Sequence, residues 1–228
     1  MGSGTQLSGT QMPHLQALEA ALVPLADVER AAAMSAYMRG QFPFLGIPTP
    51  ARRAAVKPVL NALRSASAGE LLSLADELWM RPEREYQYAA LDLLAMHWKK
   101  LGHTHVPALL ALAQRKSWWD TVDGLASIIG DVLRREHHGM DDALAHGDFW
   151  VRRIALLHQL GWGTSTDLER LFRYALALCH EKEFFIQKAI GWALRDYARH
   201  APDAVRAFLA GPGACLAPLS RREAAKHL

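Results

Sequence analysis

The chain has 228 residues, half of them hydrophobic, which is enough to bury a sizeable core in one domain or one repeat array. Its formal net charge of +3 permits a polyanionic partner without requiring one. The two cysteines, Cys179 and Cys215, are far apart and lack CxxC spacing, which argues against a disulfide framework and a zinc site. No apolar run of membrane-spanning length and no signal-peptide pattern is present, so we expect a soluble, cytoplasmic protein.

Residues 1–11 are rich in Gly, Ser, Thr and Gln, and we expect them to be a flexible leader or a cloning remnant outside a single folded domain over 12–228. Beyond them, apolar residues recur at spacings of three and four, and alternation of period two is scarce. Helices are predicted on this basis at 12–38, 68–79, 85–101, 118–133, 149–160, 167–179 and 184–200. Because short Gly, Pro, Asp and His clusters separate them, neighbouring helices should be antiparallel and the fold all-α.

Three of these segments resemble one another. Residues 85–91, 150–156 and 185–191 align with Gln87, Arg152 and Gln187 in register. The offsets between them fit about two periods and one period of a helical-pair repeat. This predicts a HEAT-like solenoid, whose concave and here basic face would be lined by one helix of each pair. An irregular helical bundle with chance similarity is the alternative.

The segment 116–133 is the most informative part of the chain. As one helix, with Ser117 as its N-cap and Asp120 in its first turn, it places one apolar stripe in the core. That stripe consists of Trp118, Val122, Leu125, Ile129 and Val132. A second strip, rotated by about 100°, contains Trp119, Asp123, Ala126 and Gly130. It joins an aromatic ring and a carboxylate to small residues, so a ligand could approach there. The alternatives are core packing for Trp119 and a solvated carboxylate for Asp123.

Two further helices carry candidate cations. Arg153 lies in an apolar sector of its helix, where its planar guanidinium suits a phosphate, although a buried salt bridge or a snorkelling side chain would also explain it. Near the end of the chain, Lys188, Trp192, Arg195 and Arg199 recur at steps of four, three and four. Such a mixture of cations and an aromatic ring is typical of nucleic-acid contacts, and a solvated charged face is the alternative. Gly191, beside Trp192, indicates close packing or close approach of a ligand.

Five sequence stretches carry a family resemblance. They are YMRGQFPFLGI at 37–47, KSWWDTVD at 116–123, FWVRRIALLHQL at 149–160, EFFIQKAIGWALRDYA at 183–198 and LAPLSRREAAKH near the C-terminus. Together they resemble one family, the AlkD-type DNA alkylation repair glycosylases. The resemblance extends over residues 15–228 and implies a HEAT-like repeat fold. It also implies that Asp123 is the catalytic aspartate, with Trp119 and Trp192 beside it, and that Arg153 contacts a phosphate and Tyr37 contributes the aromatic side chain of the N-terminal helix.

The implied activity is hydrolysis of the glycosidic bond of N3- and N7-alkylated purines, such as 3-methyladenine and 7-methylguanine, in base excision repair. The implied partner is double-stranded DNA containing alkylated bases. We expect a monomer. We also expect no cofactor and no metal, because the histidines form no HExxH pair and no phosphate-binding loop motif is present. Two other functions stay open at this point. A helical array is often a protein-binding scaffold, and a DNA-binding protein that recognises damage without cleaving would need the cations and aromatics but not Asp123.

Overall fold

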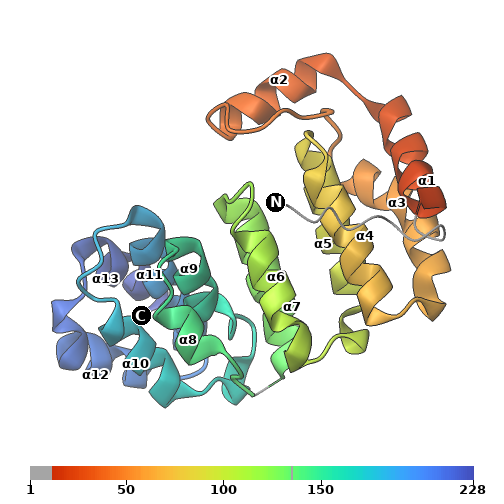
Figure 1. The fold of residues 1–228 in the computed structure, drawn as a ribbon. Coiled ribbons are helices and arrows are strands. Elements are labelled where there is room, and N and C mark those ends of the chain that lie inside the picture. The colour runs from red at the N-terminus through yellow and green to blue at the C-terminus, as the bar shows by residue number, and fades with distance from the viewer. Residues whose placement is uncertain (1–11, 135) are drawn as a thin grey trace. The chain divides into compact units, whose positions relative to one another are not determined.

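The computed structural model describes residues 12–134 and 136–228, so the predicted leader at 1–11 lies outside the described residues. Every regular element in the described ranges is an α-helix or a 3-10 helix, and these ranges contain no strand (Figure 1). The predicted all-α fold class is therefore confirmed. None of the helices described here has the length and apolar character that crossing a membrane requires.

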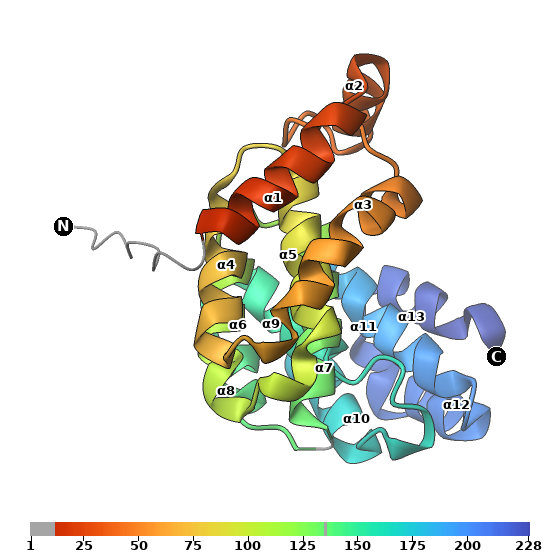
Figure 2. The ribbon, with the colours of Figure 1, turned by 90° about the vertical axis from the view of Figure 1, so that its right-hand side faces the viewer.

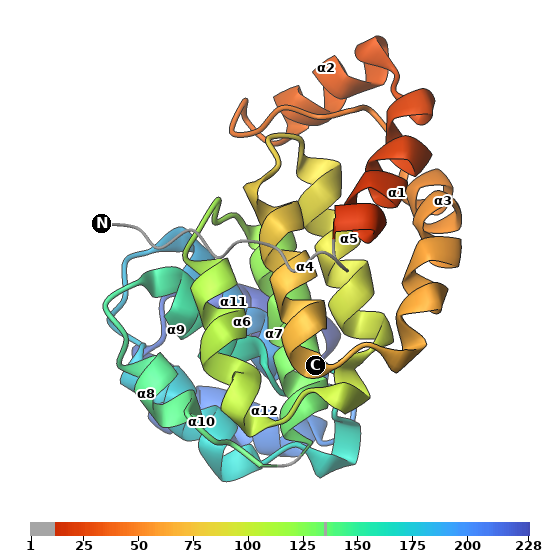
Figure 3. The ribbon, with the colours of Figure 1, turned by 45° about the vertical axis from the view of Figure 1, so that its right-hand side comes forward.

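The chain separates into two compact units, with the boundary between Leu101 and Gly102. The single domain that we expected over 12–228 thus contains two units, each described by itself below. The first comprises α1 (Met12–Leu22), α2 (Val28–Tyr37), α3 (Thr49–Ala62), α4 (Ala68–Met80) and α5 (Arg84–Met96). The paired α4 and α5 run side by side, as Figure 3 shows.

The helix predicted over 12–38 is in fact two helices, which corrects the sequence prediction. Pro24 lies in a 3-10 turn, Val23–Leu25, and a proline ring cannot continue the backbone hydrogen bonding of a helix. The chain then turns at Asp27, whose carboxylate accepts a hydrogen bond from the backbone N–H of Arg30 at 3.0 Å and begins α2. No residue of α2 is buried, and its last residue, Tyr37, is 72% exposed.

A buried carboxylate holds the loop that follows α2. Glu85 accepts hydrogen bonds from the backbone N–H groups of Leu45, Gly46 and Ile47 at 2.9 to 3.1 Å. Gly46 has φ +88°, and a Cβ there would lie 2.0 Å from the carbonyl oxygen of Asp27, so only glycine fits. The stretch at 37–47 that carried part of the family resemblance therefore has a structural role in its second half.

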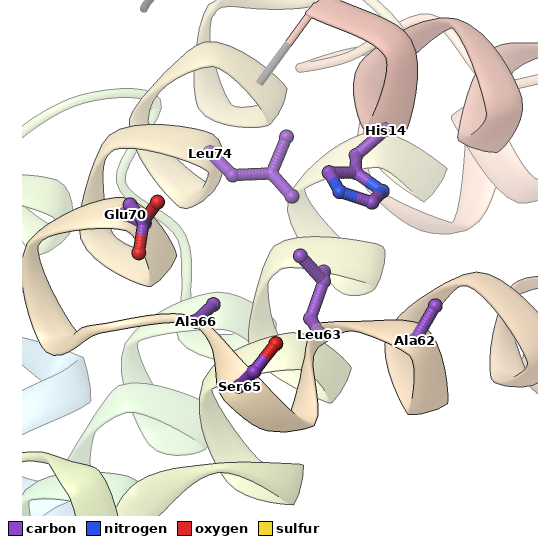
Figure 4. A pocket seen from close by; sticks show the side chains of 7 residues that line it. All are labelled: His14, Ala62, Leu63, Ser65, Ala66, Glu70 and Leu74. Atoms are coloured by element: carbon purple, nitrogen blue, oxygen red, sulfur yellow. The ribbon is translucent and has the colours of Figure 1, made fainter. Parts of the chain in front are cut away.

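The first unit also contains the pocket shown in Figure 4. Its walls come from α1, from the end of α3 with the 3-10 turn after it, and from α4, and they include His14, Leu63, Glu70 and Leu74. Its volume of about 130 Å³ is smaller than the roughly 300 Å³ at which small-molecule sites begin. We assign no ligand to it.

The second unit contains eight described α-helices. They are α6 (Val106–Ala113), α7 (Trp119–Leu133), α8 (Met140–Leu144), α9 (Phe149–Leu157), α10 (Leu168–Ala177), α11 (Phe184–Ala198), α12 (Pro202–Ala210) and α13 (Pro218–Ala224). In this unit α9 packs against both α7 and α11, and α11 makes its most extensive contact with α13 (Figure 2). Two helices from distant parts of the sequence, α7 and α11, thus meet at α9.

The predicted repeat register is confirmed by hydrogen bonds that recur at equivalent positions. Gln87 donates from its side chain to the carbonyl of Arg81 at 2.8 Å, and Arg152 to that of His146 at 2.7 Å. Gln187 donates in the same way to the carbonyl of Glu181 at 3.0 Å. In each case the acceptor lies six residues earlier, so the side chain binds a backbone carbonyl in the loop before its own helix. The three aligned segments therefore have one structural role, as homologous repeats would.

The cysteines, far apart in sequence, are neighbours in the second unit. Cys179 is buried after α10, whereas Cys215 is exposed at the end of a 3-10 turn, Pro212–Cys215. The Cys215 thiol donates to the backbone carbonyl of Pro212 at 3.5 Å, and burial, together with the neighbouring Cys215, raises the pKa of the Cys179 thiol. Both are free thiols, as expected from the absence of a disulfide pattern in the sequence.

Candidate functional site

The candidate site begins where α6 turns into α7. Lys116 adopts a left-handed backbone conformation with φ +49°, and the extended Trp118 is the N-cap residue of α7. Ser117, which we predicted to be the N-cap, instead donates its hydroxyl to the carbonyl of Ala113 at 2.6 Å, so that prediction was wrong. Asp120 lies in the first turn of the helix as expected, where the helix dipole favours a negative charge.

The second strip of α7 is only partly available to a ligand. Ala126 is 1% exposed, and a Cβ on Gly130 would lie 2.0 Å from the carbonyl oxygen of His158. These two small residues allow close packing of α7 against the chain at the end of α9, which corrects the prediction that they admit a ligand. Trp119 and Asp123, one turn apart, are half-buried and keep some surface.

Asp123 forms an ion pair with Arg153 from α9. The Arg153 Nε atom donates to Oδ1 at 2.8 Å, and Nη2 donates to Oδ2 at 2.9 Å. The third nitrogen, Nη1, donates to the backbone carbonyl of Phe185 at the start of α11. This parallel two-bond geometry is the strongest form of a carboxylate–guanidinium pair, and it fixes the plane of the carboxylate.

The two partners differ in exposure. The Arg153 side chain is 1% exposed, whereas 24% of the Asp123 side chain is exposed. Arg153 thus presents almost no surface to a DNA phosphate, and the phosphate contact that we expected of it does not fit this geometry. Of the alternatives weighed from the sequence, the buried salt bridge is the one observed. Asp123 is the more accessible member of the pair.

The environment of Asp123 acts on its pKa in two directions. Burial, the largest effect, raises the pKa because the anion loses solvation, and the charge of Asp120 adds to this. The hydrogen bonds and positive charge of Arg153 lower the pKa, but the net shift is upward. Asp123 therefore has the perturbed ionisation that is common in functional carboxylates.

An aromatic cluster supports this pair. Trp118 packs edge-on against Phe185, with ring centroids 5.3 Å apart, and Trp150 lies 4.8 Å from Phe185. Trp118, predicted to be in the core stripe, is half-buried in this cluster. The cluster holds the start of α11, whose Phe185 carbonyl accepts the third bond from Arg153. The sequence analysis missed Phe185, because a backbone acceptor leaves no signal in residue type.

Trp192 lies beside the pair with cations near its ring. The Arg153 guanidinium carbon is 5.3 Å from the ring centroid, and the Lys188 ammonium is 5.4 Å from it. Both distances are within the range of cation–π attraction. Trp192 is half-buried, so part of its surface stays available. The structure therefore brings Trp192 and Asp123 to the same guanidinium.

The cations of α11 have a shared partner that the sequence analysis missed. Glu223 of α13 is 4% exposed and pairs with Lys188 at 2.9 Å and with Arg195 at 3.3 Å. Arg199, at the C-cap of α11, is exposed. A Cβ on Gly191 would lie 2.4 Å from the Cβ of Glu223, so this glycine serves helix packing and not ligand approach.

Candidate residues also lie in the first unit. Tyr37 presents its ring at the exposed end of α2. Arg52 is 4% exposed and pairs with Asp92 at 3.1 Å, while the exposed Arg53 contacts the same carboxylate at 3.1 Å. Across the described ranges, no three His, Cys, Asp or Glu side chains are grouped in a way that could hold a metal ion.

Two comparisons with known proteins agree. A family model described as "DNA alkylation repair enzyme" matches residues 18–228. A solved structure described as "Predicted DNA alkylation repair enzyme from Enterococcus faecalis" matches with a TM-score of 0.82 and 35% sequence identity, over 89% of this chain and 96% of that chain. No match was found among the curated proteins. Both matches include residues of both units.

Proposed function

The chain belongs to the DNA alkylation repair enzyme family, and we propose that it is a DNA glycosylase that removes cationic N3- and N7-alkylated purines from duplex DNA. Alkylation at these nitrogens gives the base a positive charge, so the base leaves readily as a neutral molecule. Breaking the glycosidic bond leaves a deoxyribose with the character of an oxocarbenium ion. The protein then has one main task, which is to stabilise a cation and direct water to it.

Asp123 is the residue suited to that task. Its ionised carboxylate, placed near the anomeric carbon, stabilises the developing positive charge and accepts a proton from the attacking water. Arg153 acts as a positioning residue, because its two parallel bonds hold both carboxylate oxygens in one plane. We therefore assign Arg153 to orientation of Asp123 and no longer to a phosphate contact.

Trp119 and Trp192 complete the centre in this proposal. An indole face is electron-rich and attracts a cation, and its flat surface also packs on a sugar edge. Trp119 precedes Asp123 by one helical turn, and Trp192 lies 5.3 Å from the guanidinium that holds Asp123. Exposed parts of Lys188, Arg195 and Arg199, with Tyr37 of the first unit, would contact the DNA backbone.

The observation that carries the proposal is the partly exposed carboxylate of Asp123, held by a guanidinium that is itself buried. The test is incubation of the protein with methylated duplex DNA, followed by chromatography of the freed bases. Release of 3-methyladenine or 7-methylguanine supports the proposal. If duplex DNA is bound but no base is released, the chain is a damage-recognition protein without catalysis, and the Asp123–Arg153 pair is only structural.

A further inference from the structure

Glu223 binds three cations at once. Its Oε1 lies 2.9 Å from the Lys188 ammonium, and its Oε2 lies 3.3 Å from Arg195 Nη1 and 2.9 Å from the Lys226 ammonium. Lys188 and Arg195 belong to α11, whereas Lys226 lies in the 3-10 turn Ala225–His227 after α13. The carboxylate is buried, with its side chain 5% exposed. Burial alone would raise its pKa, but the hydrogen bonds and charges of Lys226 and Lys188 lower it to about 2.

The packing of α13 on α11 determines where this carboxylate lies. Gly191 lets the Cβ of Glu223 approach α11 more closely than any other residue type would permit. Ser220, three residues before Glu223, donates its hydroxyl to the backbone carbonyl of Gln187 at 2.8 Å. The two contacts fix both ends of the helical turn that carries Glu223. Its side chain is therefore held in place before any ligand arrives.

Each cation keeps donors for a second partner. The exposed side-chain fractions are 22% for Lys188, 24% for Arg195 and 46% for Lys226. An ammonium has three N–H donors and a guanidinium has five, so one contact with Glu223 leaves most of them unused. Three cations this close would repel each other without the carboxylate. With it, the cluster retains two net positive charges and a defined geometry.

We propose that Glu223 is a positioning residue that gathers Lys188, Arg195 and Lys226 into one binding site for a DNA backbone phosphate. This inference rests on the proposed function, because that function is the reason for choosing DNA as the ligand. It adds Lys226, which the sequence did not single out, and it explains why an acidic residue of α13 packs against the basic residues of α11. The site lies beside Trp192, whose ring is 5.4 Å from the Lys188 ammonium, so a phosphate bound there would hold the strand next to Asp123 and Trp192.

The decisive variant is Glu223→Asp, which keeps the negative charge but shortens the side chain by one methylene. Binding to undamaged duplex DNA is measured by fluorescence anisotropy over a range of salt concentrations. Because the net charge is unchanged, a purely Coulombic role predicts wild-type affinity. We expect affinity several-fold weaker and a slope of log K against log salt that is smaller by about one. Wild-type affinity and slope in a folded Glu223→Asp protein would overturn the proposal.

A second variant keeps the test informative if Glu223→Asp fails to fold. Lys226→Ala removes the most exposed cation of the cluster and should also reduce the slope by about one. Its matched control is Arg206→Ala, since Arg206 is likewise a partly exposed cation paired three residues away, with Asp203 at 2.7 Å. If Lys226→Ala and Arg206→Ala had equal effects on DNA binding, the cluster would contribute no more than any surface cation, and the proposal would be overturned. Base release by the wild-type protein is scored separately, so failure of the glycosylase activity is distinguished from failure of this site.

Discussion

Arg153 donates to both carboxylate oxygens of Asp123, across 30 residues of sequence, while its own side chain is 1% exposed. The guanidinium is thus enclosed between α7, α9 and the start of α11, and the carboxylate is the part of the pair that faces outward. The different exposure of the two side chains gives Asp123 and Arg153 different roles, which the sequence alone did not distinguish. Arg153 holds Asp123, and in the proposed function Asp123 meets the substrate.

Asp123→Asn should abolish most base release. The amide keeps the shape but has no charge to stabilise an oxocarbenium ion, so we expect a loss of about 10²- to 10³-fold in the rate of release from methylated DNA. The substitution also leaves the buried Arg153 without its counterion, which costs about 3 kcal/mol of folding free energy. The rate is therefore measured well below the unfolding temperature of the variant.

Asp131→Asn is the matched control for that substitution. Asp131 lies on the same helix, α7, and is exposed, so it changes the net charge of the protein by the same amount. We expect wild-type base release and wild-type stability. Equal losses in the two variants would show that overall charge, and not the carboxylate of Asp123, determines the rate.

The pH dependence of base release should change with Arg153→Lys. In the proposed mechanism the reaction needs ionised Asp123, so the rate should fall as the pH falls through the pKa of this carboxyl. Arg153 lowers that pKa against the larger effect of burial. A lysine cannot provide the same two parallel bonds, so the pKa rises further and the acid limb of the rate profile moves to higher pH.

The same variant separates the two roles considered for Arg153. If Arg153 held a phosphate, Arg153→Lys would leave the acid limb in place and would weaken DNA binding, because lysine loses the planar two-bond contact while keeping the charge. A single-turnover rate profile from pH 5 to 9, with binding measured at two salt concentrations, distinguishes these outcomes. An unmoved acid limb would contradict the positioning role.

Much of the fold follows from local sequence signals. The spacing of apolar residues predicted the helical character, and the alignment of Gln87, Arg152 and Gln187 identified side chains with one shared hydrogen-bonding role. Boundaries were less accurate where a cap determines them. Ser117 has the residue type of an N-cap, yet Trp118 occupies that position because the left-handed turn at Lys116 directs the Ser117 hydroxyl back to Ala113.

For the candidate site, the sequence indicated individual residues but not which of them pair with one another. Helical spacing placed Trp119 and Asp123 on one strip, and it placed Arg153 in an apolar sector that required a partner. Neither pattern indicated that Asp123 is that partner, because the contact joins α7 and α9. Glu223 was missed for the same reason, since its role depends on how α13 packs at Gly191.

Trp192 should contribute to the rate of base release through its ring. Trp192→Phe keeps an aromatic face with weaker attraction for a cation, whereas Trp192→Ala removes it. We expect kcat/KM to fall in the order wild type, Phe, Ala, with a total loss of about 1–2 kcal/mol, or roughly 5- to 30-fold. Trp162→Phe is the control, because that ring packs on His137 and His158. A larger loss in the control would contradict the role assigned to Trp192.

Gly130→Ala should destabilise the second unit. The added Cβ would lie 2.0 Å from the carbonyl oxygen of His158, so α7 and the chain after α9 must move apart. We expect a loss of about 3 kcal/mol in unfolding free energy.

Gly69→Ala is the contrasting variant, since nothing lies within 4 Å of a Cβ there and alanine favours the helix by up to about 1 kcal/mol. Denaturant unfolding of both variants measures the difference, and equal stabilities would contradict the close packing at Gly130.

The pH dependence of stability should report the ion pairs of Glu223. Its partners hold its folded pKa at about 2, below the ordinary value of 4.5, so the anion stabilises the folded protein at neutral pH. The stabilisation amounts to about 3 kcal/mol at pH 7 and is lost as the pH falls from about 4.5 through 2. Glu223→Gln should therefore be less stable than wild type by about that amount at pH 7, and this difference in unfolding free energy should shrink at pH 3.

The control is Asp203→Asn, at a residue with a 94% exposed side chain, which should show no such change between the two pH values. A difference for Glu223→Gln that is the same at pH 7 and pH 3 would show that packing at Gly191, and not the charge of Glu223, supplies the stability.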